Sequence, residues 1–150
     1  PVVMTSSLRF LAVISTLFAA SCFAAQAQSK QNKMFQKGTL AELNQRAIQS
    51  EKDFFFFIWE DENEGLTSYY RDTIFANRAI ANQMKDRFIC VSAQSTSDIG
   101  ISFSKQLRHT EFPAMMFVGW KKGDELYSLE GRMEIDQVLD HLERIDYRKP

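Results

Sequence analysis

The chain has 150 residues, of which 45% are hydrophobic and 25% are charged, a composition typical of one globular domain. Thirteen phenylalanines provide enough large side chains for a substantial hydrophobic core. The net charge of −1, with basic and acidic residues interspersed, argues against a nucleic-acid-binding protein.

The N-terminal segment has the pattern of a secretory signal peptide. A short lead that carries Arg9 precedes an apolar stretch, residues 10–20, which is too short to span a bilayer as a helix. Residues 25–27, Ala-Gln-Ala, match the A-x-A cleavage pattern. We therefore predict a signal peptide over 1–27, cleaved before Gln28, and a mature protein that is periplasmic or secreted.

The chain has two cysteines, Cys22 and Cys90. In an alternative interpretation Cys22 is the lipidated residue of a lipoprotein, which would anchor the protein to the membrane, although Ala19 stands where such signals usually have leucine. Cleavage before Gln28 would remove Cys22 and leave Cys90 alone, which cannot close an intramolecular disulfide or supply a dithiol. The chain has only two histidines in addition to its cysteines, so we expect no structural zinc site. We also expect no bound cofactor.

Residues 28–37 are polar and have no hydrophobic period, so we expect a flexible lead-in to a domain that spans 38–150. The domain begins with a capping box, in which Thr39 and Glu42 can satisfy backbone N–H groups reciprocally. Apolar residues at helical spacing follow, and they predict a helix over 39–51.

The next segment, FFFFIW at 54–59, is a continuous apolar run. A run of this length is typical of a strand that is buried on both faces. It is followed directly by an acidic loop, EDENEG at 60–65. The carboxylates of this loop are expected to be solvated and to favour the N-terminus of the following helix.

The later elements follow from hydrophobic periodicity and turn chemistry. We expect helices over 67–75, 77–84, 102–108 and 135–145, strands over 88–91, 114–118 and 125–129, and a polar loop over 92–100. The order α-β-α-β-α-β-β-α predicts an α/β fold with a central mixed β-sheet of about four strands, flanked by helices on both faces.

This order, together with Phe112-Pro113 directly before a buried strand, resembles the thioredoxin-fold superfamily. The likeness extends over about 38–146 and includes features of the secreted thioredoxin-like branch. These features are the phenylalanine-rich first strand, the helix ending in Ile74-Phe75, the Asn77–Met84 helix, and the Gly123 hairpin that returns to Leu129-Glu130-Gly131.

The resemblance implies a site at the start of the helix after the first strand. There the superfamily carries two cysteines separated by two residues, and the helix dipole lowers the thiol pKa. In this chain the two positions are expected near Glu64 and Thr67, and no cysteine occurs from 54 to 89. The resemblance also implies that the bond before Pro113 is cis and that its loop pairs with extended peptides, whereas a simple turn proline is the alternative.

Two other groups of residues resemble functional sites less closely. Cys90 lies within FICV, where apolar neighbours raise the pKa of a thiol and block access, so a core position is favoured over a nucleophile. Glu60, Glu62 and Glu64 imitate the first half of a calcium-binding EF-hand loop. Arg71, however, stands at the twelfth position, where a bidentate glutamate is required, so a solvated turn is favoured over a metal site.

The two histidines are expected on the solvated surface. His109, close to the Pro113 connector and to Glu111, could act as a general base, but the sequence places no serine or cysteine nucleophile beside it. His141 lies among charged residues of the last helix.

We therefore predict a non-catalytic thioredoxin-like domain, exported to the cell envelope, that binds a protein or peptide partner. The expected binding rim combines the 60–67 loop with the Pro113 loop, and its residues are Trp59, Glu62, Glu64, Thr67, Phe112 and Pro113. The rings of Trp59, Tyr69, Tyr70 and Phe112 either edge one groove or belong to the core. Three alternatives stay open: an oxidoreductase-related enzyme with a single cysteine, a metal-assisted activity at the acidic loop, and a structural subunit of an envelope assembly.

Overall fold

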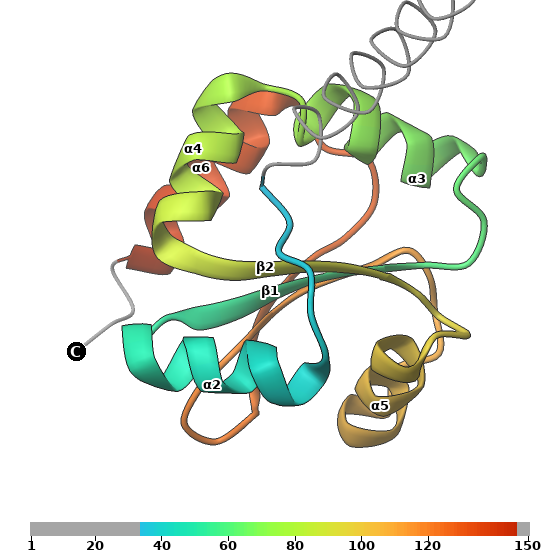
Figure 1. Ribbon diagram of the computed structural model, residues 1–150. Coiled ribbons are helices and arrows are strands. Elements are labelled where there is room, and N and C mark those ends of the chain that lie inside the picture. The colour runs from blue at the N-terminus through green and yellow to red at the C-terminus, as the bar shows by residue number, and fades with distance from the viewer. Residues whose placement is uncertain (1–33, 147–150) are drawn as a thin grey trace, which may run out of the picture. The chain divides into compact units, whose positions relative to one another are not determined.

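The structure, a computed structural model, describes residues 34–146 (Figure 1). The predicted signal peptide, its cleavage before Gln28 and the alternative lipidation of Cys22 concern residues outside this range. Among the described helices, none combines the length and the apolar character needed to cross a membrane.

The described range begins at Met34, within the segment 28–37 that was predicted as a lead-in. Met34 is buried in the core, with 5% of its surface exposed. The backbone N–H of Gln36 donates to the carbonyl of Cys90 over 2.8 Å. The described end of the predicted lead-in therefore packs against the domain.

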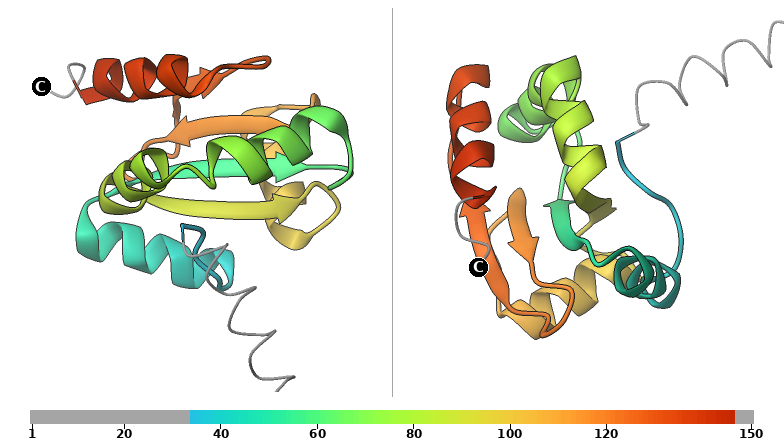
Figure 2. Two further views of the ribbon diagram at one scale, coloured as in Figure 1. Left: turned by 90° about the horizontal axis from the view of Figure 1, so that it is seen from above. Right: turned by 90° about the vertical axis from the view of Figure 1, so that its left-hand side faces the viewer.

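Four strands form one mixed sheet in the order β2-β1-β3-β4 (Figure 2). The strands are β1 (Asp53–Trp59), β2 (Phe88–Gln94), β3 (Ala114–Val118) and β4 (Glu125–Leu129). β1 is parallel to β2 and antiparallel to β3, and β3 is antiparallel to β4. Phe56 pairs with Val91 on one side and with Met116 on the other, so the phenylalanine run occupies the centre of the sheet.

Helices cover both faces of this sheet, as predicted (Figures 1 and 2). They are α2 (Leu40–Ser50), α3 (Gly65–Tyr69), η1 (Tyr70–Ile74, a π-helical turn that continues α3), α4 (Arg78–Arg87), α5 (Asp98–Leu107) and α6 (Ile135–Asp146). The predicted capping box is confirmed, because Glu42 N–H donates to Thr39 Oγ1 over 3.2 Å and Thr39 N–H donates to Glu42 Oε2 over 2.9 Å. The cap at Asn77 is confirmed too, since its Oδ1 accepts the N–H of Ile80 over 3.2 Å.

Two hydrophobic clusters lie on the two faces, because successive side chains of a strand point to opposite sides. Phe55 and Phe57 join the cluster under α3, η1, α4 and α6. Phe54, Phe56 and Ile58 join the cluster under α2 and α5. The prediction that the strand at 54–59 is buried on both faces is therefore confirmed.

The structure differs from the prediction after Val91. β2 continues through Ser92 to Gln94, where a polar loop was expected, because these residues pair with β1. α5 begins at Asp98 and not at 102, since the Oγ of Ser97 accepts the N–H of Gly100 over 3.1 Å and caps the helix. The polar side chains of Ser92 and Gln94 gave no strand signal in the sequence, because this part of β2 is stabilised by pairing with β1.

The topology brings three chain segments to one edge of the sheet. β1 and β2 are parallel, so the loops that follow them leave the same edge (Figure 1). β3 begins at that edge, because Ala114 pairs with Ile58. The acidic loop after Trp59 and the connector before Ala114 are therefore neighbours in space, as the sequence predicted.

Candidate functional site

The acidic loop after β1 has a backbone that is held at several points. Asp61 Oδ1 accepts the N–H of Asn63 over 2.9 Å, and the Asp61 carbonyl accepts the N–H of Glu64 over 3.2 Å. Gln94 Nε2 donates to the Glu60 carbonyl over 3.2 Å, which ties the loop to the end of β2. The loop therefore presents its exposed carboxylates from a defined turn.

One further bond ties the loop to the helix that follows it. Arg71 Nη1 donates to the Glu62 carbonyl over 2.9 Å, while its Nε donates to Asp72 over 2.9 Å. Arg71, which occupies the position where a calcium loop would need a glutamate, is thus engaged with main chain and a neighbouring carboxylate. Within the described range no group of three or more His, Cys, Asp or Glu side chains is arranged to hold a metal ion.

Glu64 and Thr67, the positions expected for the two cysteines, form the first turn of α3. Glu64 is the N-cap, and its carboxylate accepts the N–H of Leu66 over 3.1 Å and that of Thr67 over 2.9 Å. The hydroxyl of Thr67 donates to the same carboxylate over 3.1 Å. The backbone N–H groups of Leu66 and Thr67 lower the pKa of Glu64, so the carboxylate is ionised at neutral pH.

This turn carries no nucleophile of the kind a dithiol enzyme uses. Thr67 is 2% exposed, so its hydroxyl faces Glu64 and not the solvent. Within the predicted rim, Thr67 therefore fixes the position of Glu64 and offers almost no surface of its own. Glu62 and Glu64 are exposed and present their charges at the edge of the sheet.

Two tyrosines fix α3 and η1 to the connector between β4 and α6. The hydroxyl of Tyr69 donates to the Met133 carbonyl over 2.7 Å, and that of Tyr70 donates to the Gly131 carbonyl over 2.8 Å. The guanidinium of Arg132 lies 3.9 Å above the Tyr69 ring. These contacts fix the helix whose start carries the acidic cap.

The peptide bond between Phe112 and Pro113 is cis, as the resemblance implied. Phe112 and Pro113 are both half-buried. The ring of Phe112 lies 6.3 Å from the ring of His109, which lies 6.1 Å from that of Phe103 on α5. The connector is thus attached to the α5 side of the sheet.

The four rings considered for one groove are divided between the two faces. Trp59 packs against the cluster under α3, and its Nε1 donates to Ser92 Oγ over 3.3 Å. Phe112 packs against the cluster on the opposite face. Tyr70 is fully buried, so it belongs to the core. This division follows from the alternation of side chains along a strand. Trp59 lies two residues after Phe57 and therefore shares its face of the sheet. Ala114 pairs with Ile58, and Phe112 lies two residues before Ala114, so Phe112 lies on the face of Ile58.

Cys90 lies in the core, as its apolar neighbours predicted. Its side chain is 0% exposed, and its Sγ lies 3.5 Å from the Met84 carbonyl. Burial raises the pKa of the Cys90 thiol to about 12, against a smaller opposing effect of the Lys52 ammonium. A thiol in this state is neither accessible nor ionised at neutral pH.

The expectation of solvated histidines was wrong for His141. Its side chain is half-buried, and its Nδ1 forms a hydrogen bond with the hydroxyl of Tyr127 on β4. His109 is also half-buried, between the rings of Phe103 and Phe112. Neither contact can be read from the sequence, since each joins residues of different elements.

Comparisons with known proteins place the fold. No protein-family model and no curated protein sequence matches the chain. Among solved structures, a thioredoxin from Thermus thermophilus is similar with a TM-score of 0.63 and 14% identity, covering 75% of this chain and 87% of the other.

Two further structures have the same fold. The DsbH oxidoreductase has a TM-score of 0.64 and 13% identity, covering 77% of this chain and 86% of its own. A candidate disulphide-isomerase from Bacteroides thetaiotaomicron has a TM-score of 0.62 and 16% identity, covering 77% of this chain and 94% of its own. The predicted thioredoxin-like fold is confirmed, and likeness at this level of identity carries the fold alone.

Proposed function

We propose that this thioredoxin-like chain is a non-catalytic domain that binds a protein or peptide partner through the rim formed by the 60–67 loop and the Pro113 loop. The observation that carries the proposal is the first turn of α3. There a carboxylate, Glu64, and a buried hydroxyl, Thr67, bond to each other near the two positions where the resemblance implies thiols. Neither group can exchange with a disulfide.

The chemistry of the rim supports binding of a basic partner. Glu60, Asp61, Glu62 and Glu64 are exposed on a turn whose backbone is tied to β2 and to η1. A fixed array of like charges attracts an oppositely charged partner without a large ordering cost. The half-buried Phe112 and Pro113, adjacent at the start of β3, add apolar surface beside these charges.

The alternative of an oxidoreductase with a single cysteine depends on Cys90. The burial of its thiol and its raised pKa both oppose this alternative. In the alternative of a structural subunit in an envelope assembly, the same rim would contact a neighbouring subunit. The two binding roles differ in whether the partner dissociates.

Site-specific photo-crosslinking tests the proposal. A photoreactive amino acid is placed at Glu62 on the acidic loop, at Glu111 beside the Pro113 loop, or at Lys85 on α4 as an exposed control. We expect one protein adduct of the same mass from positions 62 and 111 and none from position 85. Adducts from position 85 alone, or different adducts from 62 and 111, would show that the two loops do not form one rim.

The proposed export is supported by the signal-peptide pattern over 1–27. N-terminal sequencing of the mature protein tests it, and we expect Gln28 as the first residue. A lipidated Cys22 at the N-terminus would support the anchored alternative, and an unprocessed chain would contradict export.

A further inference from the structure

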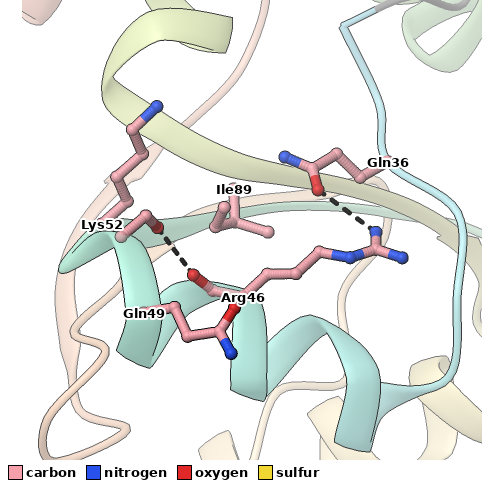
Figure 3. Close-up of a pocket in the computed structure, with 6 residues that line it drawn as sticks. Gln36, Arg46, Gln49, Lys52 and Ile89 are labelled. Atoms are coloured by element: carbon pink, nitrogen blue, oxygen red, sulfur yellow. Dashed lines mark hydrogen bonds between the residues drawn. The ribbon is translucent and has the colours of Figure 1, made fainter.

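A polar hollow lies where α2 meets the edge of β2, away from the rim. It has a volume of about 350 Å³ and is lined by Gln36, Arg46, Gln49, Ser50, Lys52 and Ile89 (Figure 3). Ile89 is the second residue of β2 and so lies at the start of this strand. The rim lies at the other end, where Gln94, the last residue of β2, bonds to Glu60 of the acidic loop. The hollow and the rim are therefore at opposite ends of the sheet.

One side of the hollow is formed by the segment before α2. The N–H of Gln36 donates to the Cys90 carbonyl over 2.8 Å and attaches this segment to β2. Arg46 Nη1 donates to Gln36 Oε1 over 3.2 Å and to the Lys37 carbonyl over 2.9 Å. The guanidinium of Arg46 is thus held in place by two acceptors, neither of which carries a charge.

The cationic groups of the hollow have unused hydrogen-bond donors. Neither Arg46 nor Lys52 forms an ion pair with a carboxylate of residues 34–146. Nε and Nη2 of Arg46 donate to no described atom, and the same holds for Nζ of Lys52. Glu42, one turn before Arg46, accepts from Thr39 in the capping box.

The two cations are separated by an apolar surface. Figure 3 shows the guanidinium of Arg46 and the ammonium of Lys52 directed toward different ends of the hollow, with Ile89 between them. Ile89 belongs to the core cluster under α2 and is 3% exposed, so only a small part of its side chain reaches the hollow. The carbon stems of Arg46 and Lys52, drawn in Figure 3, form the rest of the apolar lining. Such an arrangement suits a ligand with a negative charge at each end and a carbon chain in the middle.

We propose that this hollow binds a small elongated dicarboxylate, with one carboxylate on Arg46, the other on Lys52, and the carbon chain over Ile89. A guanidinium with two free donors on one edge matches the two oxygens of a carboxylate, and an ammonium acts as a point charge. The open position keeps the cost of removing water from both charges low, so a modest affinity is expected. This site is separate from the proposed partner-binding rim, and either can exist without the other.

Calorimetric titration of the whole chain with the dicarboxylates succinate, glutarate, adipate and pimelate tests the proposal. We expect saturable binding with an optimum at one chain length, and binding that weakens as salt is added. Hexanoate, which has a single carboxylate, should bind roughly tenfold more weakly than the best dicarboxylate, because one charge-assisted contact is lost.

Three variants distinguish the site from general charge attraction. Arg46→Gln and Lys52→Gln should each lower the affinity for the best dicarboxylate to that for hexanoate, while Lys85→Gln, an exposed lysine of α4, should leave it unchanged. Lys52→Gln removes no side-chain hydrogen bond of the described structure, so it serves as the test if Arg46→Gln does not fold. Circular dichroism confirms the folding of each variant.

The following outcomes would overturn the proposal. They are the absence of saturable binding, equal affinity for hexanoate and every dicarboxylate, or equal affinity of Lys52→Gln and Lys85→Gln. Tighter binding of inorganic phosphate than of any dicarboxylate would show a one-point anion site and not the elongated one. A loss of thermal stability in Lys52→Gln without loss of binding would assign Lys52 to the end of α2 alone.

Discussion

The hydroxyl of Thr67 donates to Oε2 of Glu64 over 3.1 Å, across the first turn of α3. The backbone N–H of Thr67 also donates to this oxygen, over 2.9 Å. One carboxylate oxygen thus accepts two hydrogen bonds from a single residue, and the other accepts from Leu66. The turn near which the resemblance implied two cysteines is therefore a capped helix start.

The cap at Glu64 is expected to stabilise the protein measurably. Glu64→Ala removes the acceptor of two backbone N–H groups and one hydroxyl, so the free energy of unfolding should fall by roughly 1 kcal/mol. Glu62→Ala, an exposed neighbour, should change it by less than about 0.5 kcal/mol. Urea denaturation at neutral pH measures both. Equal effects of the two substitutions would show that the cap contributes nothing.

The cap also predicts a pH dependence. The pKa of Glu64 is lowered in the folded chain relative to its ordinary value of 4.5. A lowered folded pKa means that the contribution is complete above 4.5 and is lost as the pH falls through the lower folded value. The difference in unfolding free energy between the wild type and Glu64→Ala should therefore shrink on acidification. A difference that stays constant down to acidic pH would contradict this assignment.

Gly100 is expected to be a position that tolerates no side chain. A Cβ there would lie 2.1 Å from the Gln94 carbonyl oxygen and 2.7 Å from the Cα of Ser95. Because these atoms are backbone, Gly100→Ala should destabilise the protein by about 1–3 kcal/mol. Gly65, at the start of α3, has no atom within 4 Å of such a Cβ, so Gly65→Ala is the matched control. It should be neutral or stabilising, and thermal unfolding distinguishes the two.

Cys90 is expected to be inert in the native protein. Its thiol is 0% exposed and its pKa is raised to about 12, so alkylation by iodoacetamide at neutral pH should be slow and should become fast in denaturant. Mass spectrometry of the peptide that contains Cys90 follows the reaction at this position. Ser92→Cys, two residues further along β2 and exposed, is the matched control and should react rapidly without denaturant. Fast native labelling of Cys90 would support the single-cysteine enzyme.

Much of the fold could be predicted because local signals and tertiary contacts agree. The capping box at Thr39 and the cap at Asn77 are read from three-residue spacings, and both are present. The apolar run at 54–59 favoured a strand buried on both faces, since it has no polar positions that could face solvent. The cis bond before Pro113 was implied by resemblance and not by any local pattern.

The parts that were missed depend on contacts between elements. Ser92 and Gln94 are polar, and their strand conformation comes from pairing with Phe57 and Trp59. The bond between His141 and Tyr127 joins α6 to β4, which no sequence period relates. Glu64 was expected among several equivalent carboxylates, but only the folded turn shows which of them caps the helix.

The last prediction concerns the rim itself. Glu62 is exposed, and only its backbone carbonyl bonds to Arg71, so Glu62→Lys leaves that hydrogen bond possible. The new charge comes near Arg71, but exposed pairs of this kind contribute at most about 1 kcal/mol, so stability should change little.

Binding should respond to Glu62→Lys in a particular way. If the partner identified by crosslinking is basic, its association should become slower, and the difference from wild type should disappear at high salt. Phe112→Ala should weaken the same partner with little salt dependence, because the lost contact is apolar. Ile101→Ala on α5, an exposed apolar side chain outside the rim, is the matched control for Phe112. Surface plasmon resonance at several salt concentrations measures all three. If Glu62→Lys and Phe112→Ala bind as tightly as Ile101→Ala, the partner does not contact the rim, and the acidic loop is only a solvated turn.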